Sequence, residues 1–285
     1  MKKRKVRSVD GAIHLRDSPA EGALARGLEV LKAVGQAREP LGNAELVELT
    51  GLPKATVSRM THTLAALGYI DYVEPLGRYR IGAGGVSLAY SALGGNVVVH
   101  AAIPFMEDMA ERLGLAVTIG MRSGLQMTYL ATERGQAVFS LRLTPGSSIP
   151  LISTSMGHGY LASLSVEQRE PLLKLLQKSA GRDWSNVLAV LRRNIRAYEA
   201  TGFCSVAGLW HPHINAVSVP FMPRDGTPTL VFSCGGLSNF APEDRLADSI
   251  GPDLVRLVNR VREALDTGRS APMRSAVKAR LAHGL

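Results

Sequence analysis

The chain has 285 residues, of which 20% are charged, and its formal net charge is +9 at pH 7. This length favours two domains, and the positive balance suits a polyanionic partner such as nucleic acid. No apolar run has the length of a membrane span and no hydrophobic segment follows the basic N-terminus, so we expect a cytoplasmic protein with no membrane partner.

Positive charges are concentrated near the N-terminus. Residues 1–10 hold five Lys or Arg against one Asp, whereas residues 11–90 are balanced at eight against eight. We therefore predict a basic disordered arm over residues 1–20, and a second basic tail over residues 269–285. Both segments can add salt-sensitive affinity for phosphates without adding sequence specificity.

The first predicted helix covers residues 22–38. Its residues Leu24, Leu28 and Leu31 lie on one side, which we expect to pack beneath the next two helices. The second predicted helix starts at Asn43, which suits an N-cap because its side chain accepts a hydrogen bond from a free helical N–H group.

The third predicted helix has the features of a DNA-recognition helix. Gly51 ends the second helix with a sharp turn, and Pro53 fits the first position of the third, where an N–H group has no helical partner. Apolar residues that recur at i, i+3, i+7 and i+10 share one buried face: Val57, Met60, Leu64 and Leu67. The opposite faces carry donors and cations suited to the major groove: Lys54, Thr56, Ser58, Arg59, Thr61 and His62.

A predicted hairpin follows this helix. Tyr69–Val73 is rich in β-forming residues, and Pro75-Leu76-Gly77 turns the chain. Three residues at the tip or on the return strand suit contacts with phosphates or with the minor groove: Arg78, Tyr79 and Arg80. The helices and the hairpin together predict a winged helix-turn-helix DNA-binding domain over residues 21–84.

The second half of the chain has a different pattern. We expect a linker helix over residues 85–97, and then a domain over residues 98–268 whose first helix, His100–Leu113, has Pro104 in its first turn. The other predicted elements are strands at Leu115–Met121, Leu125–Ala131, Val138–Leu143, Asn215–Phe221 and Thr229–Cys234, and helices at Met156–Leu164, Val166–Lys178, Asn186–Thr201 and from Pro242 to about Thr267. Antiparallel hairpins with helices between them predict an α+β fold.

Several motifs carry a family resemblance. In the first half they are Ala25-Arg26-Gly27-Leu28-Glu29-Val30-Leu31, Gly51-Leu52-Pro53-Lys54-Ala55-Thr56-Val57-Ser58-Arg59, Leu67-Gly68-Tyr69 and Gly77-Arg78-Tyr79-Arg80-Ile81-Gly82. In the second half they are Pro145-Gly146-Ser147-Ser148-Ile149-Pro150-Leu151, Thr154-Ser155-Met156-Gly157, Val217-Ser218-Val219-Pro220 and Ser233-Cys234-Gly235-Gly236. Over about residues 22–266 the chain resembles the IclR family of bacterial transcriptional regulators.

This resemblance implies a nucleoid-associated regulator that binds a promoter palindrome in double-stranded DNA as a homodimer or a dimer of dimers. It also implies a GAF-like C-terminal domain that needs no cofactor and binds a small effector, commonly an organic or aromatic acid of a catabolic pathway. The DNA-facing positions that match the family are Arg26, Asn43, Lys54, Ala55, Thr56, Ser58 and Arg59. The matching effector-pocket positions are Thr154, Ser155, Met156, Ser205, Ala207, Ala216, Ser233 and Gly235.

Some of these pocket residues also have a purely structural interpretation. Thr154 and Ser155 precede a predicted helix, where hydroxyls and free N–H groups either bind an anion or cap the helix. Met121 and Met156 either line a plastic apolar cavity or fill the core, as methionines commonly do.

The segment around Trp210 departs from the family pattern. Trp210 with His211 and His213 can hold an aromatic carboxylate by stacking and hydrogen bonding, or it can form an ordinary loop. No metal site is expected there, because no Cys, Asp or Glu lies within several residues to complete three or four ligands.

Other functions fit the sequence less well. Ser155 and His158 suggest a nucleophile and a base, but no nucleophile elbow, orienting acid, P-loop or dinucleotide fingerprint accompanies them, so we expect no catalytic residue and no enzyme. The alternatives that stay open are a ligand-independent architectural DNA binder and a small-molecule enzyme with a vestigial DNA domain. Cys204 and Cys234 are expected to be reduced core residues rather than redox sensors.

Overall fold

The computed structural model describes residues 22–135, 143–180, 184–223 and 227–267. The predicted basic arm, the predicted basic tail and most of the predicted strand at 138–143 lie outside the described residues. The described chain divides into two compact units, one of which ends at Asn96 while the other starts at Val97.

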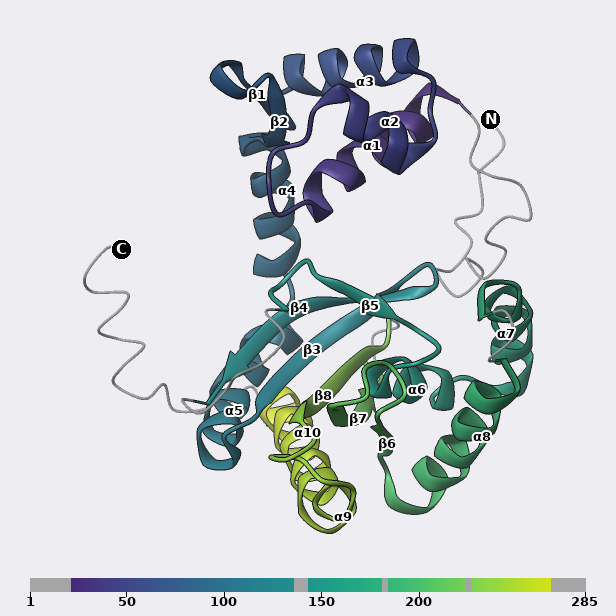
Figure 1. Ribbon diagram of the computed structural model, residues 1–285. Coiled ribbons are helices and arrows are strands. Elements are labelled where there is room, and N and C mark those ends of the chain that lie inside the picture. Colours follow the sequence, from purple (N-terminus) through teal and green to yellow (C-terminus); the bar gives the residue numbers. More distant parts are fainter. Residues whose placement is uncertain (1–21, 136–142, 181–183, 224–226, 268–285) are drawn as a thin grey trace, which may run out of the picture. The chain divides into compact units, whose positions relative to one another are not determined.

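The first unit is a helical core with a hairpin (Figure 1). Its elements are α1 (Ala23–Gln36), α2 (Asn43–Thr50), α3 (Lys54–Ala66), β1 (Ile70–Val73), a 3-10 turn (Glu74–Leu76), β2 (Arg78–Ile81) and α4 (Ala83–Gly94). The antiparallel hairpin pairs Ile70 with Ile81, and Gly77 turns it with φ of 62°, in the left-handed region that favours glycine. The predicted winged helix-turn-helix fold is confirmed.

The buried side of α1 differs from the prediction. Leu24 and Leu28 are 77% and 55% exposed, whereas Val30 and Val34 are buried in the core of the unit. The same side of α1 faces α3, since a Cβ atom on Gly27 would be in ordinary van der Waals contact, at 3.5 Å, with the Met60 sulfur. The side of α1 that carries its smallest residue therefore packs inward.

Three predictions about α2 and α3 are also corrected. Gly42 rather than Asn43 is the N-cap of α2, because the Glu45 carboxylate accepts the Gly42 N–H at 2.7 Å. Pro53 is the N-cap of α3 and not its first helical residue. Thr61 is fully buried and donates its hydroxyl to the Ser58 carbonyl at 3.0 Å, so it does not face outward.

The predicted core residue Leu67 is instead 64% exposed. The helix α3 ends at Ala66, and Gly68 adopts a left-handed φ of 72° directly after it. The chain therefore turns toward β1 before Leu67 can continue the buried stripe of Val57, Met60 and Leu64.

The second unit is built on one antiparallel sheet of order β5-β4-β3-β8-β7-β6. The strands are β3 (Ala116–Ser123), β4 (Gln126–Arg134), β5 (Ser148–Pro150), β6 (Cys204–Ala207), β7 (Ile214–Phe221) and β8 (Leu230–Leu237). The helices are α5 (Val97–Leu113), α6 (Ser155–Ala162), α7 (Val166–Ala180), α8 (Trp184–Thr201), α9 (Glu243–Arg245) and α10 (Gly251–Thr267). The predicted α+β class is confirmed, and the short strands β5 and β6 are additions to the predicted set.

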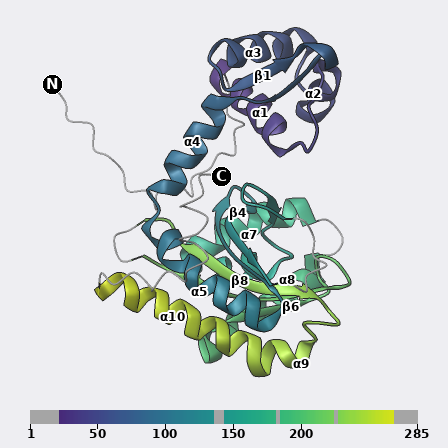
Figure 2. The ribbon, with the colours of Figure 1, turned by 90° about the vertical axis from the view of Figure 1, so that its left-hand side faces the viewer.

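Helices cover both faces of this sheet. Figure 2 shows α5 and α10 side by side, and they pack on the face that carries Val117, Val219 and Phe232. The helices α6 and α8 lie on the opposite face, where Val231 belongs to a second core cluster. Because side chains alternate along a strand, neighbouring residues on β3, β7 and β8 contribute to different clusters.

Two helices are longer or less regular than predicted. α5 begins at Val97, so Pro104 lies in its interior and not in its first turn. The C-terminal helix is interrupted by a π-helical segment, Leu246–Ile250, between α9 and α10. No single described helix is long and apolar enough to cross a membrane; only the broken pair of α4 and α5, taken together, has the required length and composition.

Candidate functional site

The outward face of α3 carries most of the predicted DNA-reading side chains. Val57, Met60 and Leu64 hold the helix against the core, which leaves the remaining faces open. The exposed residues there are Lys54, Ala55, Ser58, Arg59 and His62, and Thr56 is half-buried. This face combines two cations with hydroxyl and imidazole groups, which can contact both phosphates and base edges.

The hairpin is tied to α2 through Arg78. Its guanidinium lies 3.0 Å from the Glu45 carboxylate and donates to the Pro40 carbonyl at 2.8 Å. The pKa of Glu45 lies below its usual value, mainly because the Gly42 N–H donates to the carboxylate and also because Arg78 pairs with it. Arg78 thus has partners inside the unit, and any contact with a DNA phosphate would be additional to them.

The other predicted DNA-contacting residues of this unit have varied surroundings. Arg80 is exposed and lies 3.7 Å from the Asp71 carboxylate, and the Tyr79 ring packs against Tyr72 at a centroid distance of 5.0 Å. Arg26 is half-buried on α1. The Asn43 Oδ1 atom is buried and has no hydrogen-bond partner among the described residues.

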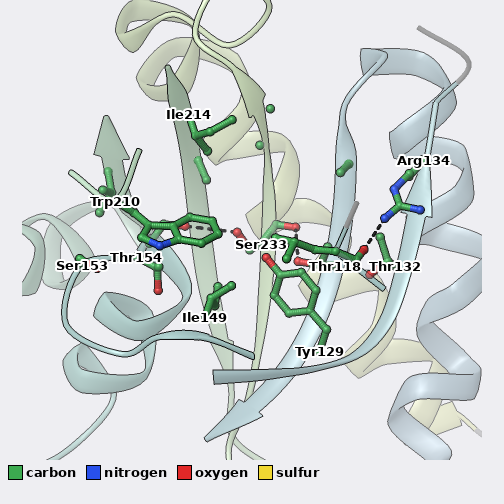
Figure 3. A pocket seen from close by; sticks show the side chains of 17 residues that line it. Thr118, Tyr129, Thr132, Arg134, Ile149, Ser153, Thr154, Trp210, Ile214 and Ser233 are labelled. Atoms are coloured by element: carbon green, nitrogen blue, oxygen red, sulfur yellow. Dashed lines mark hydrogen bonds between the residues drawn. The ribbon is translucent and has the colours of Figure 1, made fainter. Parts of the chain in front are cut away.

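The second unit contains a cavity on the α6 side of the sheet, here called the sheet pocket (Figure 3). Its volume is about 80 Å³, several times the 10–15 Å³ that one water needs. Its lining residues are Ala116, Thr118, Tyr129, Thr132, Arg134, Leu143, Ile149, Ser153, Thr154, Ser155, Val206, Trp210, Ile214, Ala216, Ser233, Gly235 and Gly236.

Strand register builds the floor of this pocket. Thr118 on β3 lies opposite both Thr132 on β4 and Ser233 on β8, so their side chains emerge on the same face. Two residues further along, Gly235 must be glycine, because a Cβ atom there would lie 2.5 Å from the Cβ atom of Ala216 on β7. The floor is therefore shallow beside Gly235 and lined with hydroxyls beside Thr118.

The N-terminus of α6 forms one wall. Thr154 is the N-cap, because its hydroxyl oxygen accepts the Gly157 N–H at 3.2 Å while its hydroxyl donates to the Pro150 carbonyl at 2.7 Å. The Ser155 and Ser233 hydroxyls lie 3.2 Å apart. The capping interpretation of Thr154 is thus confirmed, while both α6 residues also line the pocket.

Aromatic and aliphatic side chains complete the wall. Figure 3 shows the Trp210 indole lying across the cavity, with Ile149 and Ile214 around it and Tyr129 on the far side. Burial raises the pKa of Tyr129 to about 12, so its hydroxyl stays protonated and is available as a donor. This wall suits a flat apolar group.

Arg134 gives the pocket its charge. Among the described lining residues it is the only one with an ionised side chain at neutral pH. It is exposed at the rim and donates from Nη2 to the Leu143 carbonyl. Nearby, the Thr132 hydroxyl oxygen is buried without a hydrogen-bond partner among the described residues. A ligand anion at the rim would meet a cation and an unpaired hydroxyl together.

Half of the predicted effector residues line the sheet pocket. Those that do are Thr154, Ser155, Trp210, Ala216, Ser233 and Gly235. Those outside the lining are Met121, Met156, Ser205, Ala207, His211 and His213.

These outside positions have structural explanations. Met156 is 1% exposed within the core, with its sulfur against Gly120, and Met121 packs on the other face of the sheet. His211 and His213 are exposed, and the His211 ring packs on Trp210 at a centroid distance of 4.3 Å. Trp210 therefore reaches the cavity while the imidazoles point to solvent.

Sequence reasoning missed the contribution of β3 and β4 to the pocket. Thr118, Tyr129, Thr132 and Arg134 all line it. Along β4, Met127 and Tyr129 alternate with less buried residues, which is a period-2 signal. A bulge beside Leu130 places Ala131 in the cluster under α5 and α10 and brings Thr132 and Arg134 to the pocket. The signal indicates a strand with two different faces, but only the register shows which face meets α6.

His158 forms a buried polar link behind the pocket. Its Nε2–H donates to the Ile152 carbonyl at 2.7 Å and its Nδ1 accepts from the Asn194 side chain at 3.0 Å. The Asn194 oxygen in turn accepts the Ser205 N–H at 2.7 Å. Burial lowers the pKa of His158 to about 4, so the ring is neutral. Both ring nitrogens have partners other than Ser155, which does not support a nucleophile–base pair.

Neither cysteine has the properties of a redox sensor. Cys204 and Cys234 are free and buried, and burial raises the pKa of both thiols to about 12, which disfavours the reactive thiolate. Among the described residues, no group of three or more His, Cys, Asp or Glu side chains is arranged to hold a metal ion.

Each of the two units matches a known protein family model. Residues 23–74 match a family model described as the IclR helix-turn-helix domain, and residues 90–261 match one described as the bacterial transcriptional regulator IclR C-terminal domain. The chain is 33% identical over 250 residues to the HTH-type transcriptional regulator TsaQ1/TsaQ2 of Comamonas testosteroni, which covers 87% of this chain and 89% of that one.

Solved structures agree with this assignment. The crystal structure of an IclR family transcriptional regulator from Brucella abortus has a TM-score of 0.75 and 36% identity, covering 87% of this chain and 94% of that one. An IclR homolog from Microbacterium hydrocarbonoxydans, solved in complex with 4-hydroxybenzoate, shares the fold with a TM-score of 0.67 at 19% identity, covering 86% of this chain and all of that one.

Proposed function

This chain belongs to the IclR family of bacterial transcriptional regulators, and on that premise we propose that it recognises a specific promoter sequence in response to a small organic or aromatic acid. It is a DNA-binding regulator with an effector-binding C-terminal domain and not an enzyme. The proposal extends this to the residues that read DNA, the class of effector and the assembly that links them. It includes a site of action on the nucleoid in the cytoplasm.

The sheet pocket is the observation that carries the effector class. Its lining includes the aromatic side chains of Trp210 and Tyr129, its floor presents hydroxyls, and its rim holds Arg134 beside the Thr132 hydroxyl, which has no hydrogen-bond partner among the described residues. An aromatic acid matches this order, because its ring would lie along Trp210 while its carboxylate meets the arginine. The 4-hydroxybenzoate bound to the Microbacterium homolog is a ligand of this chemistry, and we propose it as the first probe.

DNA recognition is assigned to α3 and the hairpin. Arg59 and Lys54 are exposed on α3, and the hairpin carries the exposed Arg80. Base edges would be read by Arg59 with Ser58, while Lys54 and Arg80 would hold phosphates. Arg78 would act indirectly, because its contacts with Glu45 and Pro40 fix the hairpin against α2.

We propose a homo-oligomer because the first unit has exposed apolar side chains. The helix α4 has no buried residue although it carries Val86, Leu88 and Tyr90, and α1 exposes Leu24 and Leu28. Water-exposed apolar surface of this extent favours association. A second copy would cover it and bring two recognition helices to the two halves of a palindrome.

Effector binding would then change DNA affinity through α4, which joins the two units. The change can be no larger than the difference in effector affinity between the two arrangements of the recognition helices. A ligand that binds tightly and leaves operator affinity unchanged would remove this part of the proposal.

The effector assignment is tested with single-tryptophan proteins, because the chain has two tryptophans. In a Trp184→Phe variant, Trp210 is the only indole left, and we expect its fluorescence to change saturably with 4-hydroxybenzoate. 4-Hydroxybenzyl alcohol, which keeps the phenol and lacks the carboxylate, is the matched control and should bind weakly. An unchanged Trp210 signal with 4-hydroxybenzoate and with other aromatic acids would argue against an aromatic acid as effector.

A further inference from the structure

The second unit has another cavity, on the outer side of α7 and α8, which is here called the α7–α8 groove. It is lined by Arg169, Leu173 and Lys174 from α7 and by Trp184, Leu188 and Arg192 from α8. Its volume is about 400 Å³, which lies within the usual range of small-molecule sites. None of its lining residues belongs to the sheet pocket.

Helical spacing explains why the groove has two kinds of lining. Leu172 and Leu176 bury one stripe of α7 in the core cluster that also holds Leu191 of α8. Residues 169, 173 and 177 follow at intervals of four on the neighbouring stripe, which is left facing α8 across the groove. The lining of the groove therefore combines apolar and charged side chains.

The charges in the groove are unbalanced. Arg169, Lys174 and Arg192 line it, against the single carboxylate of Glu170. The Arg169 Nη1 atom is buried and has no hydrogen-bond partner among the described residues. A buried guanidinium donor without a partner is costly, and an anionic acceptor is the group that satisfies it best.

The apolar part of the lining indicates the rest of the ligand. Trp184 and Leu188 are only half-buried and pack on the core with one side. Their remaining surface faces the groove together with Leu173. An inorganic anion would leave this apolar surface exposed to water, whereas an anion that carries an alkyl or aromatic group would cover it.

We propose that the α7–α8 groove is a second ligand site of this protein, which takes a small organic anion with an apolar body. The anionic group lies against Arg169, with Lys174 and Arg192 on the two walls. The apolar body lies along Trp184 and Leu188. This site is separate from the sheet pocket, so it stands whether or not the sheet pocket binds an aromatic acid.

The test uses the tryptophan that lies in the groove. In a Trp210→Phe variant of the full chain, Trp184 is the only indole. We expect its fluorescence to change saturably on titration with octanoate, and not with 1-octanol, which has the same alkyl chain without the charge. Equal responses to both ligands, or none to octanoate, would overturn the proposal.

Arg169→Gln supplies the decisive variant. In the Trp210→Phe background it should weaken octanoate binding about tenfold or more, because the charge-assisted hydrogen bond is lost. Lys178→Gln removes the same charge from an exposed position of α7 that does not line the groove, and it should leave octanoate affinity unchanged. An Arg169→Gln protein that is folded by circular dichroism and binds octanoate normally would contradict the assigned contact.

One more outcome identifies a different occupant. If a second copy of the chain covers the groove, Trp184 fluorescence will depend on protein concentration without octanoate, and sedimentation will show that Arg169→Gln changes the oligomeric state. That result would overturn the proposal of a small-molecule site. The response of Trp210 to 4-hydroxybenzoate in the Trp184→Phe variant is independent of it and tests the sheet pocket alone.

Discussion

Arg134 is the residue on which ligand charge selection at the sheet pocket depends. We expect Arg134→Gln to weaken 4-hydroxybenzoate binding about tenfold, which corresponds to about 1.4 kcal/mol and is modest because the arginine is exposed at the rim. Trp210 fluorescence in the Trp184→Phe background measures the change. Lys178→Gln is the charge-matched control, and equal affinity of both variants would show that the carboxylate does not contact Arg134.

His158 is expected to make the stability of the folded protein depend on pH. Its pKa is lowered from 6.5 to about 4 in the folded protein, so the unfolded chain binds more protons between those values and the free energy of unfolding falls as the pH drops from 6.5 toward 4. This one group accounts for up to about 3 kcal/mol of the fall. Urea denaturation at pH 7.5 and pH 5 should show about 2 kcal/mol of this fall, because pH 5 still lies above the folded pKa.

The matched variant for this prediction is His158→Gln, which keeps a hydrogen-bonding side chain and removes the titration. It should lose about 1–3 kcal/mol at pH 7.5, since the Ile152 carbonyl or the Asn194 amide loses a well-placed partner. Its stability should then decrease less between pH 7.5 and pH 5 than that of the parent chain. The same pH dependence in both proteins would rule out His158 as the source.

The sequence predicted the buried stripe of the recognition helix, although Pro53, Thr61 and Leu67 lie differently from the prediction. The buried stripe of Val57, Met60 and Leu64 is a strong helical signal, and it alone fixes which side of α3 faces outward. The turn at Gly51 and the return at Gly77 also follow from the sequence, because both residues adopt the left-handed conformation that glycine favours.

Arg59 on this helix is expected to contribute to the sequence specificity of DNA binding. Arg59→Ala should reduce the discrimination between the operator and random DNA by about 1–3 kcal/mol if the guanidinium makes a bidentate base contact. Competition binding at one salt concentration measures the two affinities. Lys32→Ala on the exposed side of α1 is the control. An equal loss on both DNAs would show that Arg59 contacts only phosphate.

The buried side of α1 and the start of α5 could not be predicted from the local sequence pattern. The physical reason differs between the two helices. On α1 two apolar stripes compete, and packing against α3 selects the one that carries Val30 and Val34, which the local pattern does not show. In α5 the residues before Pro104 continue the helix, which a proline permits at a cost when tertiary packing offsets it.

Only part of the effector pocket could likewise be predicted from the sequence. Its α6 wall follows a motif that is local in sequence, so Thr154 and Ser155 were predicted. Its floor joins β3, β4 and β8, which are far apart in sequence, and the pairing of Thr118 with Thr132 and Ser233 is known only from the register. Arg134 was missed for this reason.

At the scale of the whole molecule, the account requires more than one copy of the chain. The proposed interface includes Tyr90, which is 72% exposed on a helix with no buried residue. Tyr90→Glu should therefore lower the oligomeric state measured by analytical ultracentrifugation and weaken operator binding, because two recognition helices would no longer be held together. Glu199→Gln, an exposed change on α8 of the second unit, should alter neither. A Tyr90→Glu protein with unchanged mass would place the interface elsewhere.

Quantitative footprinting of the full chain on DNA upstream of its own and neighbouring genes shows whether it is a ligand-responsive, sequence-specific regulator. It is done with excess random DNA, in the absence and presence of saturating 4-hydroxybenzoate. We predict a palindrome that stays protected in excess random DNA. The protein concentration that gives half-protection should shift when 4-hydroxybenzoate is added. Protection that random DNA removes entirely would contradict a sequence-specific regulator and favour a ligand-independent architectural DNA binder.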